Sequence, residues 1–181
     1  GEFYQLDFEM SFATQEDVFK VIEEVVPYTF EKFTNWKVDK GPFVRIPYKE
    51  AMEKYGIDKP DLRNPLIIQD VTECFKDSDF NAFKGKTVKV IVVPDGNNQG
   101  RKFFDKMGEF ATSNDVGAKG LAWTKIDENG EVTGGIAKFI TPEIKETLQG
   151  KYGATKNAAM FFIADEFEKA QKIAGLVRIE L

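Results

Sequence analysis

The first twelve residues alternate between apolar and polar side chains. The apolar positions are Tyr4, Leu6, Phe8, Met10 and Phe12, and the polar positions are Gln5, Asp7, Glu9 and Ser11. Because successive side chains of a strand point to opposite faces, this alternation predicts a half-buried strand over residues 3–12. A helix is expected from Thr14, with a kink or an end at Pro27, since proline removes one helical hydrogen bond.

The next stretch indicates a boundary between two parts of the chain. A short strand is expected at 43–46, followed by a helix from Pro47 to Tyr55 that Gly56 ends. Residues 58–65 hold two prolines among charged and polar groups, which is typical of a linker. We therefore predict a segment over residues 1–64 and a separate domain over residues 65–181.

The second part predicts an α+β domain. Strands are expected at 66–75, 87–93, 120–127, 131–140 and 158–165, and helices at 101–113, 141–149 and 166–181. Asn129-Gly130 is a strong hairpin signal, and Thr141 before Pro142 is a typical helix start. The pattern predicts a mostly antiparallel sheet of about five strands with helices packed on it, a two-layer sandwich.

Composition excludes several classes of function. The chain is 42% hydrophobic and 13% aromatic, which is enough for a packed core. Its net charge of -5 argues against a general binder of polyanions. It has no histidine, which excludes Ser-His or Cys-His catalysis and His-ligated zinc within the chain. The single cysteine, Cys74, forms no internal disulfide, suits a reducing cytosol and is interpreted as a structural thiol.

Two short motifs fail on their spacing. Gly85-Lys86-Thr87 resembles the end of a phosphate-binding loop, but Phe80 stands where that loop needs a glycine. The spacing of Asp77, Asp79 and Asn81 resembles the first ligands of a calcium loop, but Val88 replaces the required glutamate. Both stretches are interpreted as turns, and no metal site is expected.

Three groups of charged or polar residues remain open to two interpretations. Gln5, Asp7 and Glu9 form either a solvated strand face or a row of acceptors in a cleft, and pattern alone favours the first. Residues 59–63 are either a solvated linker or a rigid loop that presents charge to an anionic partner. A weak basic patch is also conceivable, formed by Lys84, Lys86, Lys89, Arg101, Lys102 and Lys119.

Several stretches closely resemble the bacterial aspartyl-tRNA synthetases, a class II family. Residues 1–12 resemble the second strand of motif 2, and residues 14–19 continue the pattern. Residues 45–63 are similar to the most recognisable stretch of that family. Residues from about Pro65 to Leu181 look like its inserted GAD domain, with matches at Ile91-Val92-Val93-Pro94, Gly117-Ala118-Lys119-Gly120-Leu121-Ala122-Trp123, Ile136-Ala137-Lys138-Phe139 and Val177-Arg178-Ile179-Glu180-Leu181.

The resemblance implies an activity for a longer parent protein. That parent would join aspartate to ATP, with Mg²⁺, and transfer it to the tRNA; it is expected to be a cytoplasmic homodimer. Asp7 corresponds to the residue that binds the amino group of aspartate, while Gln5 and Glu9 share the cleft face in less certain roles. The GAD domain is expected to be antiparallel α+β and to contact the tRNA acceptor arm or to serve a structural role.

The resemblance also sets an expectation for the chain itself. The motif 2 arginine that clamps the ATP α-phosphate, together with motifs 1 and 3 and the anticodon-binding barrel, is absent from these 181 residues. The chain is therefore expected to be an inactive fragment that holds no bound cofactor. The alternative is a non-catalytic, tRNA-binding subunit of an amidotransferase that contains a GAD domain. Such subunits, however, have no stretches similar to residues 1–63.

Overall fold

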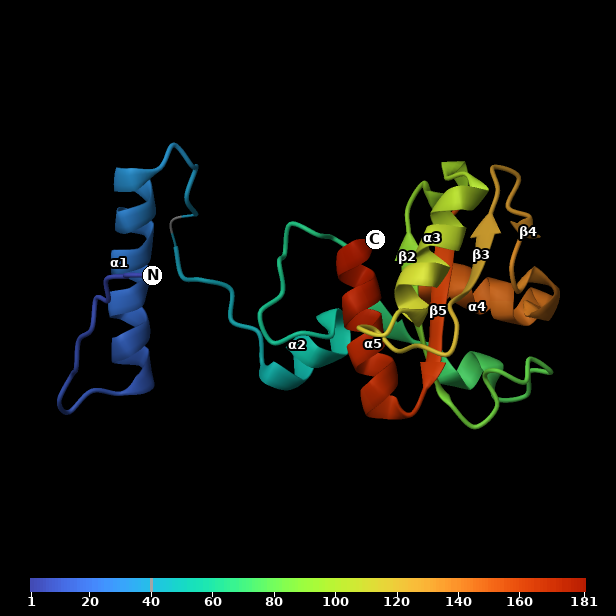
Figure 1. Cartoon of the computed structure of the whole chain (residues 1–181), viewed down its shortest axis with the longest axis horizontal. Coiled ribbons are helices and arrows are strands. Elements are labelled where there is room, and N and C mark those ends of the chain that lie inside the picture. The colour runs from blue at the N-terminus through green and yellow to red at the C-terminus, as the bar shows by residue number, and fades with distance from the viewer. Residues whose placement is uncertain (40) are drawn as a thin grey trace. The chain divides into compact units, whose positions relative to one another are not determined.

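The computed structural model describes every residue except position 40. The chain forms two compact units, Gly1–Arg45 and Ile46–Leu181, and each is described by itself (Figure 1). Within the described residues, no helix combines the length and the apolar character that a membrane crossing requires.

The first unit is built around one helix, α1 (Gln15–Phe33). Asp17 accepts hydrogen bonds from the backbone N–H and the hydroxyl of Thr14, at 2.9 and 2.7 Å, which caps the start of the helix. The helix continues through Pro27, so of the two expectations for this proline, a kink or an end, the end is wrong. Proline removes one hydrogen bond of the ladder, and the turns on either side carry the helix across that gap.

The predicted strand over residues 3–12 does not form. Residues 1–10 are exposed and belong to no strand. The expected short strand at 43–46 is absent too, and the described part of this unit contains no strand with which residues 3–12 could pair. Alternating side chains therefore do not suffice here, because a strand needs a neighbour for its backbone N–H and C=O groups.

The second unit contains a five-stranded sheet in the order β1-β2-β5-β3-β4. The strands are β1 (Ile68–Asp70), β2 (Thr87–Val93), β3 (Ala122–Ile126), β4 (Val132–Thr133) and β5 (Ala159–Asp165). Every pairing is antiparallel, and β5 lies at the centre between β2 and β3. The predicted α+β class with a mostly antiparallel sheet is confirmed.

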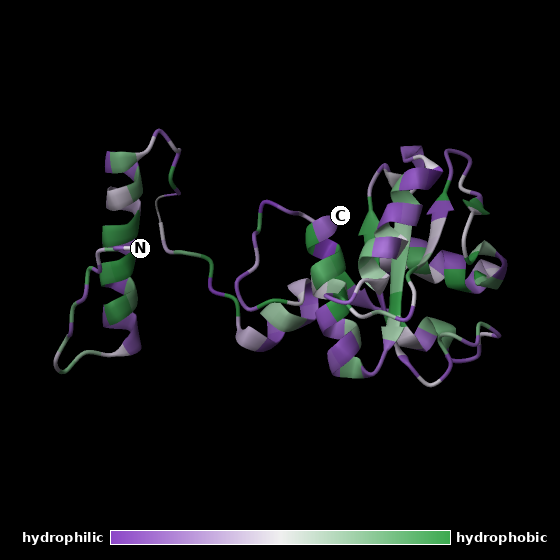
Figure 2. Cartoon of the chain, in the orientation of Figure 1, coloured by the Kyte–Doolittle hydropathy of each residue, from purple (hydrophilic) through white to green (hydrophobic). Residues whose placement is uncertain are grey.

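Helices cover this sheet and bury its apolar side chains. On one face, α3 (Arg101–Thr112) and α5 (Phe167–Glu180) pack over a core that includes Phe104, Phe161 and Ile173. On the other face, α4 (Pro142–Tyr152) and the 3₁₀ turn Thr72–Phe75 cover a second core around Phe75 and Phe162. Figure 2 shows that β2 and β5, which run between these layers, are largely hydrophobic.

The hairpin predicted at Asn129-Gly130 is present, but its second strand is short. β4 ends at Thr133, and the expected continuation to residue 140 is replaced by a turn and a 3₁₀ helix, Ala137–Phe139. Gly135 has φ +38°, and a Cβ built there would lie 1.8 Å from the carbonyl oxygen of Trp123. Glycine therefore lets the chain fold tightly over Trp123 instead of extending the strand.

Helix α2 (Tyr48–Tyr55) belongs to the second unit, although it precedes the predicted boundary at 64/65. Its C-cap, Gly56, meets Gly175 of α5 so closely that a Cβ on Gly56 would lie 2.4 Å from the Cα of Gly175. The side-chain amide of Gln171 donates to the carbonyl oxygens of Met52 and Glu53. These contacts join α2 to α5, so the compact unit begins before the linker. The assignment of residues 1–64 to a catalytic segment and of 65–181 to a GAD domain remains a prediction.

Limited trypsin digestion should cut first between the two units. Residues 34–46 contain no helix or strand among the described positions and offer Lys37 and Arg45 as cleavage sites. Arg63 lies in a loop that is bound to α5 and serves as an internal comparison site, whereas Lys59 precedes Pro60 and is not a trypsin site. Mass spectrometry of early products should reveal a resistant piece that starts near Ile46. A first cut at Arg63 or inside the sheet would contradict this division.

Candidate functional site

The predicted acceptors Gln5, Asp7 and Glu9 are exposed in the first unit and lie in no strand. The structure of this unit does not gather the three into a cleft. Their assignment therefore rests on sequence resemblance, and the role of Asp7 in binding aspartate remains a prediction.

The charged loop at residues 59–63 is more ordered than a solvated linker. The guanidinium of Arg63 donates to both oxygens of Asp61, with Nε at 3.0 and 3.1 Å. These hydrogen bonds lower the pKa of Asp61 to about 2. Because Arg63 is already engaged by a carboxylate, the pair presents little net positive charge to an anionic partner.

Arg178 of α5 anchors this loop from within the protein. Its side chain is 1% exposed. Nε donates to the carbonyl oxygen of Leu66 at 2.6 Å, and Nη2 donates to those of Asn64 and Asp61 at 2.8 and 3.3 Å. The side chain of Asn64 donates in turn to the carbonyl oxygen of Arg178 at 3.0 Å. The loop is thus held to the end of α5 by four hydrogen bonds between residues far apart in sequence.

The structure divides the suggested basic patch. Lys89 is buried, and its ammonium forms an ion pair with Asp70 at 3.0 Å and lies over the ring of Phe167, so it is not part of any basic surface. Arg101 pairs with Asp105 on its own helix. Lys86 and Lys119, in contrast, come together at the edge of one cavity.

That cavity, of about 390 Å³, is the strongest candidate site in the second unit. Its floor is formed by Ala122 of β3 and by Phe162 and Ala164 of β5. Phe80 and Phe83, from the segment before β2, form a wall, and their rings meet edge to face at a centroid distance of 4.7 Å. A volume in this range suits one small ligand.

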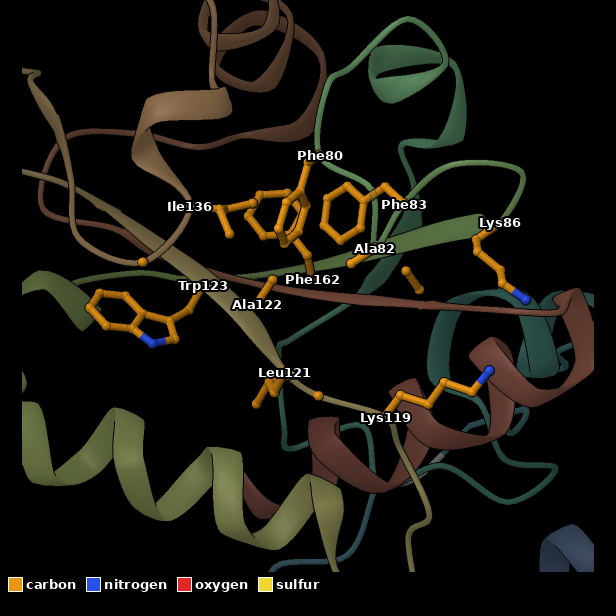
Figure 3. A pocket seen from close by; sticks show the side chains of 13 residues that line it. Phe80, Ala82, Phe83, Lys86, Lys119, Leu121, Ala122, Trp123, Ile136 and Phe162 are labelled. Atoms are coloured by element: carbon orange, nitrogen blue, oxygen red, sulfur yellow. The ribbon is translucent and has the colours of Figure 1, made fainter.

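Figure 3 shows how the two ends of the cavity differ. Trp123 and Ile136 lie at one end, where the tight turn at Gly135 forms the rim. Lys86 and Lys119 lie at the other end. The result is an aromatic and aliphatic interior with two ammonium groups at a single end, an arrangement that fits an apolar ring joined to an anionic group.

Sequence reasoning missed this cavity. The sequence places Lys86 in a turn and, with Lys119, in a weak basic patch. No short motif joins these lysines to Phe80 and Ala164, since three segments far apart in sequence contribute them. One signal was available: Ala122 and Ala164 are small residues on inward-facing strand positions, where larger apolar residues would normally fill the core.

Cys74 agrees with its interpretation as a structural thiol. It is partly buried beside α4, and desolvation raises the pKa of the thiol above its ordinary value. In the described residues no group of three or more Cys, Asp and Glu side chains is placed to hold a metal ion.

Comparison with known proteins gives two kinds of match. The GAD domain family matches residues 80–174. Along its whole length the chain is 54% identical to the aspartate–tRNA(Asp/Asn) ligase of Rickettsia felis and 52% identical to that of Rickettsia canadensis. It is 50% identical, over 99% of its length, to the aspartate–tRNA ligase of Streptomyces coelicolor. The chain spans 30–31% of the length of these relatives.

Proposed function

Because the chain belongs to the GAD domain family and matches aspartate–tRNA ligases along its whole length, we propose that it is part of an ATP-dependent aspartate–tRNA ligase. The observation that carries this proposal is the extent of the match. It includes residues 1–79, which lie before the GAD match, at a level of 50–54% identity overall. A GAD-containing amidotransferase subunit does not account for that similarity in the first part of the chain.

The proposed reaction has two steps. Aspartate and ATP, with Mg²⁺, give aspartyl-adenylate and pyrophosphate, and the aspartyl group then passes to the terminal ribose of the tRNA. In this proposal Asp7 pairs with the ammonium group of aspartate, while Gln5 and Glu9 lie on the same face of the substrate cleft. A carboxylate is the natural partner for an ammonium ion, since their hydrogen bond is charge-assisted.

The remaining assignments belong to the same proposal. The whole ligase is a cytoplasmic homodimer, and residues 65–181 contact the acceptor arm of the tRNA or serve a structural role. Residues 64–181 carry 16 Lys and Arg against 17 Asp and Glu, so their net charge does not attract RNA. Any contribution to RNA affinity comes from particular lysine and arginine side chains that contact phosphates. Relatives named aspartate–tRNA(Asp/Asn) ligase and aspartate–tRNA ligase match at nearly the same identity. Whether the protein also aspartylates asparagine tRNA must therefore be measured.

The full-length protein that contains this chain tests the proposal directly. We expect aspartate-dependent exchange of pyrophosphate into ATP, followed by aspartylation of purified aspartate tRNA, with asparagine tRNA assayed in parallel. The 181-residue chain alone should show no exchange, because adenylate formation needs a positive clamp on the phosphate that these residues do not supply. Absence of aspartate-dependent exchange by the folded full-length protein would overturn the proposal.

A further inference from the structure

The cavity between Trp123 and the two lysines has no role in aspartate activation as proposed above. Its interior combines aromatic rings with small side chains. Phe80 packs against Phe83 and Phe139, with centroids 4.7 Å away in each case, and Phe162 lies below them. The small floor residues Ala122 and Ala164 leave the space above them open. Planar rings pack well on such surfaces, since every nucleobase and arene has a face that stacks on an aromatic ring.

The lysines give the cavity a defined polarity. Lys86 forms an ion pair with Glu166 at 2.8 Å, but the side chain of Glu166 is 79% exposed and therefore remains well hydrated. Glu166 holds Lys86 by one hydrogen bond and is itself well hydrated, so a phosphate can replace it at little cost. Asp61, in contrast, holds Arg63 by several hydrogen bonds. The nearby carboxylate of Asp165 is paired with Lys169 at 3.0 Å, and no carboxylate among the described residues forms an ion pair with Lys119. Two ammonium groups thus lie at one end of the cavity, with the carboxylates of Glu166 and Asp165 beside them.

From these features we infer that the cavity binds one nucleotide unit, with the base among the aromatic side chains and the phosphate between Lys86 and Lys119. The volume of about 390 Å³ accommodates a single nucleotide and no duplex. The phosphate monoester of a free nucleotide offers three acceptor oxygens and up to two negative charges, so it satisfies two lysines better than a carboxylate does; the phosphodiester of a strand offers two non-bridging oxygens and one charge. The unit is either a free mononucleotide or one residue of a single RNA strand, and only the second source rests on the proposed function.

The protein carries a built-in reporter for this test. Trp123 lines the cavity, and the other of the two tryptophans, Trp36, lies in the first unit against Phe30. In the 181-residue chain with Trp36→Phe, all indole fluorescence comes from Trp123. Titration with adenosine 5′-monophosphate should quench it saturably. Adenosine and inorganic phosphate should each bind at least about tenfold more weakly, because each lacks one half of the recognised group.

Variants separate the two ends of the cavity. Lys86→Ala combined with Lys119→Ala should weaken binding of the mononucleotide by about tenfold or more, since both ammonium partners are lost. Lys102→Ala, an exposed lysine of α3 outside the cavity, is the matched control and should leave binding unchanged. Ala164→Leu should block the cavity. Urea unfolding of each variant verifies that it is folded, and the double lysine variant keeps the test valid should Ala164→Leu fail to fold.

The source of the nucleotide follows from a second titration. If a short single-stranded RNA competes with the mononucleotide and binds more tightly, the cavity reads one residue of a strand; equal or weaker binding of the RNA identifies a free nucleotide. The inference is overturned if neither probe quenches Trp123, if adenosine binds as well as its monophosphate, or if Lys102→Ala weakens binding as much as the double variant. Aspartate-dependent exchange by the full-length protein is measured separately, so failure of the cavity and failure of the ligase assignment give different results.

Discussion

Replacing Asp7 by alanine in the full-length ligase is expected to lower kcat/KM for aspartate by about tenfold to a hundredfold or more. The substrate ammonium group needs a carboxylate partner once it leaves bulk water. A charge-assisted hydrogen bond of this kind contributes roughly 1.5–3 kcal/mol, and its loss leaves the ammonium unpaired. The measurement is aspartate-dependent exchange of pyrophosphate into ATP at varied aspartate concentrations.

Matched substitutions make this prediction specific to Asp7. Asp61→Ala removes a carboxylate that is already engaged by Arg63, and Lys86→Ala removes a cavity lysine. Neither is assigned to the aspartate site, so both should leave aspartate activation nearly intact. A loss below about threefold for Asp7→Ala, under roughly 0.7 kcal/mol, would show that Asp7 is not the ammonium partner. The exposed position of Asp7 in the first unit would then describe a solvated side chain.

The second large effect is expected for Arg178→Met. Methionine keeps much of the apolar stem but removes the donors to the carbonyl oxygens of Leu66, Asn64 and Asp61. Each buried acceptor left unsatisfied costs about 1–3 kcal/mol. Some of the three carbonyl groups will bind water instead, which reduces this cost. We therefore expect the free energy of unfolding to fall by about 2–4 kcal/mol in total. Urea denaturation of the 181-residue chain measures it.

A control and a local readout accompany this variant. Arg101→Met removes an exposed arginine whose ion pair with Asp105 lies on the surface of α3, and it should change stability by less than about 0.5 kcal/mol. Trypsin should cut at Arg63 faster in Arg178→Met than in the parent chain, because the loop is released from α5. If Arg178→Met unfolds at the same urea concentration as Arg101→Met, the anchoring role of Arg178 is wrong.

Local chemistry was sufficient to predict much of the sheet. Strand β2 is a run of β-branched residues, Thr141 and Pro142 start α4, and Asn129-Gly130 turns the hairpin, as the sequence indicated. Each of these signals is complete within a few residues. They therefore identify an element without reference to the rest of the fold.

Apart from the expected helix end at Pro27, the errors share a different cause, since each depended on residues outside its own segment. The alternating residues 3–12 have no partner strand within their unit. The strand beyond Thr133 is prevented by the close approach of Gly135 to Trp123. Likewise, the cavity exists only because Lys86 and Lys119 meet across the fold. The periodicity of apolar residues does not predict such contacts, so the burial of Lys89 could not be read from the sequence, and the small residues Ala122 and Ala164 were the one sequence signal of the cavity.

The hydrogen bonds between Asn64 and Arg178 have a further consequence for evolution and engineering. They hold the segment before β1 next to the end of α5. The chain therefore enters and leaves the part of the domain formed by the sheet, α3, α4 and α5 at nearly the same point. A host protein that received residues 64–178 in one of its surface loops would need only a narrow opening in its backbone, together with a surface that covers α5 where α2 packs here. Such a module is portable: it can be gained, lost or transplanted as a cassette while the host fold stays intact.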